Sequence, residues 1–284
     1  MKKIHSNFLV ISQYNRDLSW VPEYTDNYLI YDRGPEPSYP PTIDQTKVKK
    51  APNVGYNSYD YFTYIIDHYD DLPDVVIFAK AWTWPRHVTK EYFDRVMNNS
   101  YFTPLTDWKM HKDRWPYGFF SPEGLLCELN TDIFLRHPDR PTRYVHRYND
   151  FLRFCFKEPL IPRYRMFAPG GDYIVPKANI LKLSKVVYEN LRLFMSHDKH
   201  AGETHIIERT CIQLWCGNFE LSDEIQRPLG KDFAGVPRGY KDPAYARETS
   251  MAYRGILARS LLRIRKIAAR ALHRILFLIE TKMI

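Results

Sequence analysis

The chain has 284 residues, of which 44% are hydrophobic and 15% aromatic, and its net charge is +8. This length fits one domain of about 200 to 250 residues with an additional segment, and the apolar content excludes a disordered or fibrous chain. The four cysteines have no Cys-x-x-Cys spacing, and the opening segment, whose apolar stretch is short, is not expected to be a secretory leader. We therefore expect reduced thiols rather than a zinc ribbon or a disulfide scaffold.

Short apolar runs define the first predicted elements. Strands are predicted at residues 7–13, 27–31 and 74–80, each followed by polar residues. Residues 35–53 are predicted to form a loop, and residues 56–69 a helix that ends at Asp70-Asp71-Leu72-Pro73. This order predicts a doubly wound α/β sheet, in which ligands bind beyond the carboxyl ends of the strands.

Later elements are less regular. Residues 88–99 are expected to be helical, and residues 101–166 to mix short helices with proline-rich loops. Residues 166–177 read as a glycine turn that leads into a strand. Further helices are expected over 178–196 and 203–216, and a linker rich in proline and glycine over 220–250. We expect a folded domain over 1–220, a linker over 221–250 and a terminal helix over 251–284.

The last 34 residues hold eight Lys or Arg and one Glu, which is +7 of the total charge, so the preceding body is nearly neutral. Apolar residues repeat along one helical face, and the opposite face carries Arg259, Arg263, Lys266, Arg270 and Arg274. This pattern predicts a helix that lies on an anionic membrane surface. A helix docked on the body or on a partner is the alternative. Nucleic acid is not expected as a partner, because the body has no accompanying basic face.

Several blocks of sequence, taken in order, resemble a known family. They are VISQYNRDLSW (10–20), IYDRG (30–34), NVG (53–55), IIDHYDDLPD (65–74), PGGDYIVPK (169–177), and Glu208-Arg209 with Trp215. Spread over residues 7–220, they resemble poorly characterised proteins similar to GT-A glycosyltransferases, which occur in bacterial polysaccharide clusters, fungi and large viruses. The resemblance implies a GT-A-like (Rossmann-like), mostly parallel sheet flanked by helices, and transfer of a sugar from a nucleotide donor.

The implied nucleotide-sugar pocket draws on the loops after the predicted strands. Its residues are Tyr14, Asn15, Arg16, Asp17, Asp32, Arg33, Gly34, Asn53, Gly55, Lys80, Arg86 and His87. An aspartate at a strand end accepts hydrogen bonds from a ribose hydroxyl or a base N–H, and an arginine pairs with a diphosphate. The alternative is that Asp17 and Asp32 cap the turns that follow them.

The chain departs from many GT-A enzymes in the residues that hold a metal. Those enzymes bind Mn²⁺ or Mg²⁺ with an Asp-x-Asp motif, and no Asp-x-Asp occurs here. Lys80, Arg86 and His87 are therefore the candidates for neutralising the leaving diphosphate. No cofactor is assigned, and Mn²⁺ or Mg²⁺ is left open. As alternatives, Trp82 and Trp84 pack in the core and Arg86 is a surface charge.

Two further groups of side chains contain the residue types that bind metals. Asp70 and Asp71 precede the strand at 74–80, and we interpret them as residues that end a helix away from the site. The cluster His197, Asp198, His200, Glu203 and His205 has ligand chemistry but no helical spacing such as His-Glu-x-x-His. A solvated loop is the preferred interpretation of that cluster.

Inverting sugar transfer requires a carboxylate that deprotonates the acceptor hydroxyl. The resemblance places Glu208 and Asp172 on the acceptor side, and Glu208 is the preferred candidate. As alternatives, Glu208 forms an ion pair with Arg209 or a lysine, and Asp172 is a turn residue.

Two classes of function follow. The first is a glycosyltransferase, cytoplasmic and peripheral on the inner face of the membrane, that acts on a polysaccharide or lipid-linked acceptor. The second is a non-catalytic, membrane-associated binding or assembly protein on a GT-A-like scaffold. A nuclease or nucleotidyltransferase is less favoured, because no paired-carboxylate metal site is evident.

Overall fold

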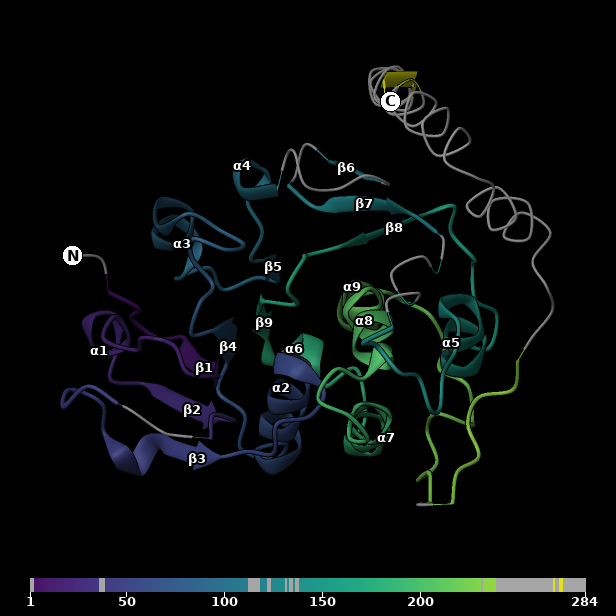
Figure 1. Ribbon diagram of the computed structural model, residues 1–284, viewed down its shortest axis with the longest axis horizontal. Helices are drawn as coiled ribbons and strands as arrows, with labels where there is room; N and C mark the ends of the chain where they lie inside the picture. Colours follow the sequence, from purple (N-terminus) through teal and green to yellow (C-terminus); the bar gives the residue numbers. More distant parts are fainter. Residues whose placement is uncertain are drawn as a thin grey trace.

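The computed structural model describes residues 3–35, 39–111, 118–121, 124–130, 132, 135, 138–230, 232–238, 268, 271 and 272. Within these ranges, a six-stranded and mostly parallel sheet forms the centre of the molecule (Figure 1). Across the sheet the strands are β3 (Val48–Lys50), β2 (Tyr28–Asp32), β1 (Phe8–Gln13), β4 (Val75–Lys80), β9 (Tyr173–Pro176) and β5 (Thr103–Pro104). The predicted α/β class with a mostly parallel sheet is confirmed.

The strand directions place polar residues at one edge of the sheet. Strands β1 to β4 run in parallel, with Val10 of β1 opposite both Leu29 and Phe78. Strand β9 is antiparallel to β4 and to β5. The start of β9 therefore lies beside the end of β4, and residues that precede β9 join the carboxyl edge of the parallel strands.

Helices flank the sheet on both sides (Figure 1). One side carries α2 (Tyr56–Asp67), α5 (Tyr148–Cys155), α6 (Lys177–Ile180), α7 (Lys185–Met195), α8 (Gly202–Glu208) and α9 (Cys211–Cys216). The other side carries α1 (Val21–Tyr24) and α3 (Lys90–Val96). Neighbouring residues of β1 face opposite sides, because Val10 packs in the first core and Leu9 in the second.

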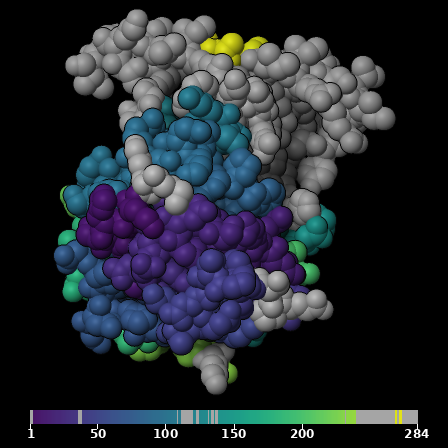
Figure 2. Space-filling model, turned by 90° about the vertical axis from the view of Figure 1, so that its left-hand side faces the viewer, coloured from purple at the N-terminus to yellow at the C-terminus, as the bar shows by residue number. Residues whose placement is uncertain are grey.

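The central strands are continuous apolar runs because helices cover both faces of the sheet, so that neighbouring residues of a strand are all buried. Figure 2 views the molecule from the side of α1 and β3. The N-terminal segments, in purple and blue, form most of that surface.

A second, smaller sheet stands apart from the first (Figure 1). Its antiparallel strands are β6 (Gly118–Phe120), β7 (Leu126–Leu129) and β8 (Tyr164–Phe167), and α4 (Trp108–His111) precedes them. The prediction of only short helices and loops over 101–166 is wrong here. These strands are three or four residues long, and partners in β7 and β8 lie far apart in sequence, so neither propensity nor periodicity reveals them.

Three predicted elements need correction. The loop expected over 35–53 contains a 3-10 helix (Gln45–Lys47) and β3. The single helix expected over 178–196 is divided into α6 and α7, and the helix expected over 203–216 is divided into α8 and α9. Apolar spacing continues across each break, which explains why the sequence suggests one helix.

The segment after α9 begins on the body of the protein. Ile225 and Val236 are buried, and the N–H of Lys157 donates to the carbonyl of Glu220 at 3.0 Å. Residues 268, 271 and 272 are helical, whereas the five basic residues assigned to the membrane-facing helix lie outside the described residues. Among the described residues, no helix is both long and apolar enough to cross a membrane.

Candidate functional site

The loops after β1 and β2 lie against one another at the carboxyl edge of the sheet. The N–H of Arg33 donates to the carbonyl of Gln13 at 3.0 Å. Asn15 has a φ of 48°, and a Cβ atom at Gly34 would lie 2.2 Å from the Asn15 Oδ1. A Cβ atom at position 34 would therefore displace the Asn15 side chain from this contact. The structure joins these predicted pocket residues into one surface.

Asp32 ends β2, is buried, and accepts hydrogen bonds from three protein donors. Its carboxylate accepts hydrogen bonds from the Gly34 N–H at 2.9 Å, from Lys50 Nζ at 2.6 Å and from the Tyr39 hydroxyl. Burial opposes ionisation, but the contacts with Lys50 and Tyr39 outweigh it and lower the pKa of Asp32. The turn-capping alternative describes the Gly34 contact, and a ribose hydroxyl would have to compete with these donors.

Asp60 of α2 is a fully buried carboxyl at the same edge, and the sequence interpretation missed it. Ser12 Oγ donates to its Oδ2 at 2.5 Å, and Arg33 Nε lies 2.9 Å from the same oxygen. Burial raises the pKa of Asp60 to about 7, and the charge of Arg33 opposes that rise. The sequence does contain a signal that Asp60 faces the interior. Asp60 is spaced at helical intervals from Asn57 and Tyr64, and all three are buried in α2.

The loop after β4 brings cations together. Lys80 Nζ lies 3.3 Å from His87 Nε2. Burial lowers the pKa of Lys80; the charges of Asp172 and Glu208 oppose this shift, and those of Arg86 and Arg33 reinforce it. Three of the predicted diphosphate-binding cations therefore act on one another electrostatically.

Trp82 is an exposed platform in this loop. It exposes 37% of its surface, and the guanidinium carbons of Arg16 and Arg86 lie 4.1 and 5.5 Å from its ring centroid. Such cation–π contacts hold both arginines at the carboxyl edge. The core interpretation is wrong for Trp82, whereas Trp84 does pack against Trp20 and Phe93.

The glycine turn before β9 is held from several elements. Gly170 and Gly171 have φ values of 100° and 70°. The Gly170 carbonyl accepts from Asn57 Nδ2 at 2.9 Å, and its N–H donates to Glu208 Oε1 at 2.6 Å. A Cβ atom at Gly170 would lie 2.7 Å from the ring of His87. The turn is thus fixed against α2, α8 and the loop after β4.

Asp172 follows this turn and is completely buried. Its two carboxylate oxygens accept hydrogen bonds from the Tyr61 hydroxyl at 2.8 Å and from Thr83 Oγ1 at 3.1 Å. Burial raises the pKa of Asp172. These contacts tie β9, α2 and the loop after β4 together.

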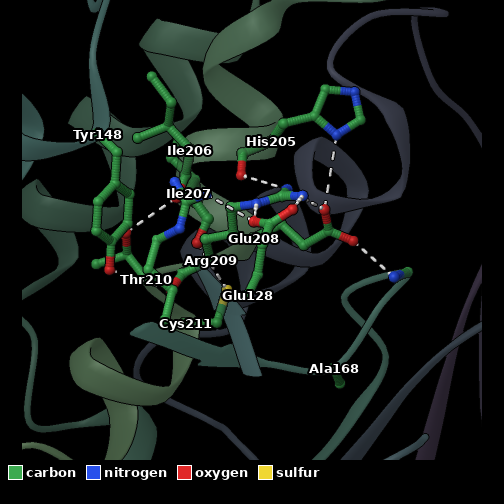
Figure 3. Close-up of polar contacts among 12 residues, drawn as sticks. Glu128, Tyr148, Ala168, His205, Ile206, Ile207, Glu208, Arg209, Thr210 and Cys211 are labelled. Atoms are coloured by element: carbon green, nitrogen blue, oxygen red, sulfur yellow. Dashed lines mark hydrogen bonds and ion pairs between the residues drawn. The ribbon is translucent and has the colours of Figure 1, made fainter. Parts of the chain in front are cut away.

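Glu208 ends α8 and points toward the turn (Figure 3). Its Oε2 lies 3.2 Å from Arg209 Nη1 and 3.6 Å from His205 Nδ1. Burial alone would raise the pKa of Glu208, but the contact with His205 and the charge of Arg209 hold it at about 2. The ion pair with Arg209 that the sequence left open is therefore present, and 14% of the Glu208 side chain remains exposed.

A buried chain of charges connects Glu208 to the second sheet (Figure 3). Arg209 Nε and Nη2 lie 2.6 and 3.2 Å from the two carboxylate oxygens of Glu128, and Arg165 Nη2 lies 2.7 Å from Glu128 Oε2. The three side chains are essentially inaccessible to solvent. Because ions buried without partners are strongly destabilising, this chain fixes α8 to β7 and β8.

Some predicted pocket residues are not joined to the others. Asp17 accepts hydrogen bonds from Ser19 Oγ at 2.7 Å and from Ser19 N–H at 2.9 Å, which lower its pKa as a local cap would. Tyr14 and Asn53 are exposed, and no hydrogen bond or ion pair among the described residues connects them to the pocket. Gly55 donates its N–H to the Asp198 carbonyl at 3.0 Å.

Within the histidine-rich cluster, the side chains of Glu203 and His197 are almost inaccessible to solvent and have structural roles, so the solvated-loop interpretation is wrong for these two residues. Glu203 accepts three backbone hydrogen bonds from residues 143–145 and lies 2.9 Å from His197 Nε2. Among the described residues, no group of three or more His, Cys, Asp or Glu side chains could hold a metal ion. The carboxylates of Asp32, Asp172 and Glu208 each accept hydrogen bonds from protein donors.

The chain belongs to the family described as "Protein of unknown function (DUF3431)", whose model matches residues 9–226. The match spans the central sheet, the glycine turn, Glu208 and Arg209. No curated protein and no solved structure matches the chain.

Proposed function

We propose that this protein is a glycosyltransferase that moves a sugar from a nucleotide-sugar donor to a polysaccharide or lipid-linked acceptor. The observation that carries the proposal is the meeting of a cation cluster (Arg33, Lys80 and Arg86) and a carboxylate-bearing turn (170–172 with Glu208) at one edge of a parallel sheet. Sugar transfer needs positive charge for a leaving diphosphate and a proton acceptor for the hydroxyl. The blocks of sequence similarity support a GT-A-like scaffold for the same reaction.

On the donor side, the cations are suited to a diphosphate. Arg33 is oriented by the Asp60 carboxyl through its Nε, and Arg16 and Arg86 are held on Trp82. A guanidinium presents several donors to phosphate oxygens in a fixed plane, and Lys80 adds a point charge. Binding of the anion would also offset the charges of Arg86 and Arg33, which reinforce the effect of burial in lowering the pKa of Lys80.

On the acceptor side, Glu208 is better placed than Asp172. Asp172 is completely buried, whereas Glu208 is partly exposed beside Gly170. The low pKa keeps Glu208 ionised at neutral pH, but it also reduces the driving force for taking up a proton. We therefore assign most of the rate enhancement to stabilisation of the leaving diphosphate by the cations.

The basic segment over 251–284 would bind the proposed enzyme to a membrane surface. An amphipathic helix over 251–284 would hold the carboxyl edge near a cytoplasmic membrane surface, where lipid-linked acceptors lie. Its seven net positive charges favour anionic headgroups.

Nucleotide binding is the first test. The purified chain is screened by thermal shift against UDP, GDP, CMP and dTDP, each with EDTA and with Mn²⁺. A nucleotide at one hundred times its Kd stabilises the fold by about 2.7 kcal/mol, and each kcal/mol raises Tm by about 2 to 4 °C in a domain of this size. Lys80→Met should abolish the shift. Lys182→Met, an exposed lysine after β9, is the matched control.

Turnover is the second test, with the sugar form of the nucleotide that binds. Glu208→Gln should lower the rate, and Asp70→Asn, a carboxylate at the other end of β4, should not. If no nucleotide shifts Tm under either metal condition, the glycosyltransferase proposal is wrong.

One observation favours the non-catalytic alternative. Both oxygens of Glu208 and of Asp172 are already engaged by protein donors. A binding or assembly protein on the same scaffold would retain the nucleotide-dependent shift but show no turnover with any sugar nucleotide. Turnover that is lost in Glu208→Gln excludes this alternative.

A further inference from the structure

The weak basicity of Glu208 raises the question of which group receives the acceptor proton. In this structure Glu208 anchors the Gly170 N–H and pairs with Arg209, so its oxygens already stabilise other groups. The side chain that contacts Glu208 from the preceding helical turn is His205, with Nδ1 at 3.6 Å from Oε2. A carboxylate that faces an imidazole nitrogen favours the tautomer with the proton on that nitrogen.

The second nitrogen of His205 is left unpaired within the described part of the chain. Nε2 is buried and has no hydrogen-bond partner among the described residues. Burial lowers the pKa of His205 despite the opposing influence of Glu208, so the imidazole is neutral at pH 7. A neutral imidazole that donates from Nδ1 carries a lone pair on Nε2. In Figure 3 the ring lies at the outer end of the charge network, away from Glu128.

His205 lies at the margin of the buried charges, beside the aromatic ring of Tyr56. The His205 side chain is 18% exposed. Tyr56 of α2 packs against it with ring centroids 5.3 Å apart, and His200 stacks on the same tyrosine. Tyr56 has a φ of 50°, which is strained for an aromatic residue, and such strain clusters at functional sites. The remaining charges that act on His205 are those of Glu208, Arg209 and Arg140.

We propose that His205 is the general base of the sugar transfer and that Glu208 is its positioning residue. This inference rests on the proposed function. The His205 Nε2 lone pair takes the proton of the acceptor hydroxyl, and the hydroxyl oxygen forms a bond to the anomeric carbon. The bond from that carbon to the diphosphate breaks, and the nucleoside diphosphate leaves with the electron pair. The imidazolium that results is stabilised by Glu208 and then releases its proton to water.

The tautomer is tested first, because it needs no substrate. Imidazole ¹H–¹⁵N correlation spectra of the full chain, assigned with His205→Gln, should show a protonated Nδ1 and an unprotonated Nε2 at pH 7. The apparent pKa of His205 should lie below 6.5. A His205 that is protonated on Nε2 at pH 7 would overturn the inference.

Turnover then distinguishes a base from a structural residue. With the nucleotide sugar identified by thermal shift, His205→Gln should lower kcat about 100-fold to 10,000-fold, remove the acidic limb of the pH profile and leave the nucleotide shift intact. His200→Gln, which removes the neighbouring stacked histidine, is the matched control and should retain kcat. Because Glu208→Gln also disturbs the buried charges, His205→Gln carries the test.

The outcomes separate the two proposals. Retained nucleotide binding with unchanged kcat in His205→Gln overturns the role of His205 and leaves the glycosyltransferase proposal standing. Absence of both nucleotide binding and turnover in the unaltered protein overturns the proposed function, and the role of His205 with it.

Discussion

Asp60→Asn should change how the stability of the protein depends on pH. Asp60 is completely buried, and its pKa of about 7 lies above the ordinary value of 3.8. The folded state therefore holds a proton that the unfolded state has lost between these values. The stability that this proton contributes is complete below pH 3.8 and declines as the pH rises to about 7. Asparagine has nearly the same shape and cannot ionise, so the variant lacks this decline.

The magnitude follows from the size of the shift. A difference of about three pKa units corresponds to about 4 kcal/mol at 1.36 kcal/mol per unit, of which about 3 kcal/mol falls between pH 5 and pH 8. Urea unfolding of both proteins at half-unit pH steps measures it. The free energy of unfolding of the unaltered protein, minus that of the variant, should fall by about this amount across the window.

A matched substitution isolates the effect of burial. Asp70→Asn removes a carboxylate that is exposed at the end of the α2 segment, and its curve should remain parallel to that of the unaltered protein. If the difference between the unaltered protein and Asp60→Asn does not vary with pH, Asp60 is ionised in the fold and the reasoning fails.

Three other predictions concern the turn, the charge chain and the tail. Gly170→Ala should destabilise the fold by about 1 to 3 kcal/mol, because its Cβ would collide with the His87 ring at positive φ, and thermal unfolding measures this. Glu128→Gln should cost about 3 to 5 kcal/mol, because two buried arginines then lose a charged partner; an unchanged urea midpoint would contradict it. Removal of 251–284 should abolish cosedimentation with anionic liposomes without lowering Tm, and equal sedimentation of both proteins would refute membrane binding.

The parts of the fold that the sequence reveals are those with continuous local patterns. The strands at 7–13, 27–31 and 74–80 are recognisable because burial on both faces leaves no polar position in their centres. The second sheet escapes prediction, because its short strands derive their stability from distant partners. Local spacing also cannot show that α8 ends at Glu208, before a break that directs Arg209 into the interior.

The candidate site shows the same division. The loops that carry Asn15 and Gly34 were expected together, because parallel strands end at one edge. The contact between Glu208 and Gly170 was only implied, and the pairing of Arg209 with Glu128 joins positions 81 residues apart that no local pattern relates. The helical spacing of Asp60 is visible in the sequence. Its raised pKa depends on complete burial, which only the packed structure shows.

The antiparallel direction of β9 has a consequence for how this family can vary. Because β9 returns beside β4, Lys80 at the end of β4 and Asp172 just before β9 lie at the same end of one strand pair, although the whole second sheet lies between them in sequence. The segment between β4 and β9 therefore begins and ends at the same pair of neighbouring strands. Insertions, deletions or a different small sheet within that segment would leave the distance between Lys80 and Asp172 unchanged. Relatives could thus exchange that part of the surface while Lys80 and Asp172 keep their places at the carboxyl edge.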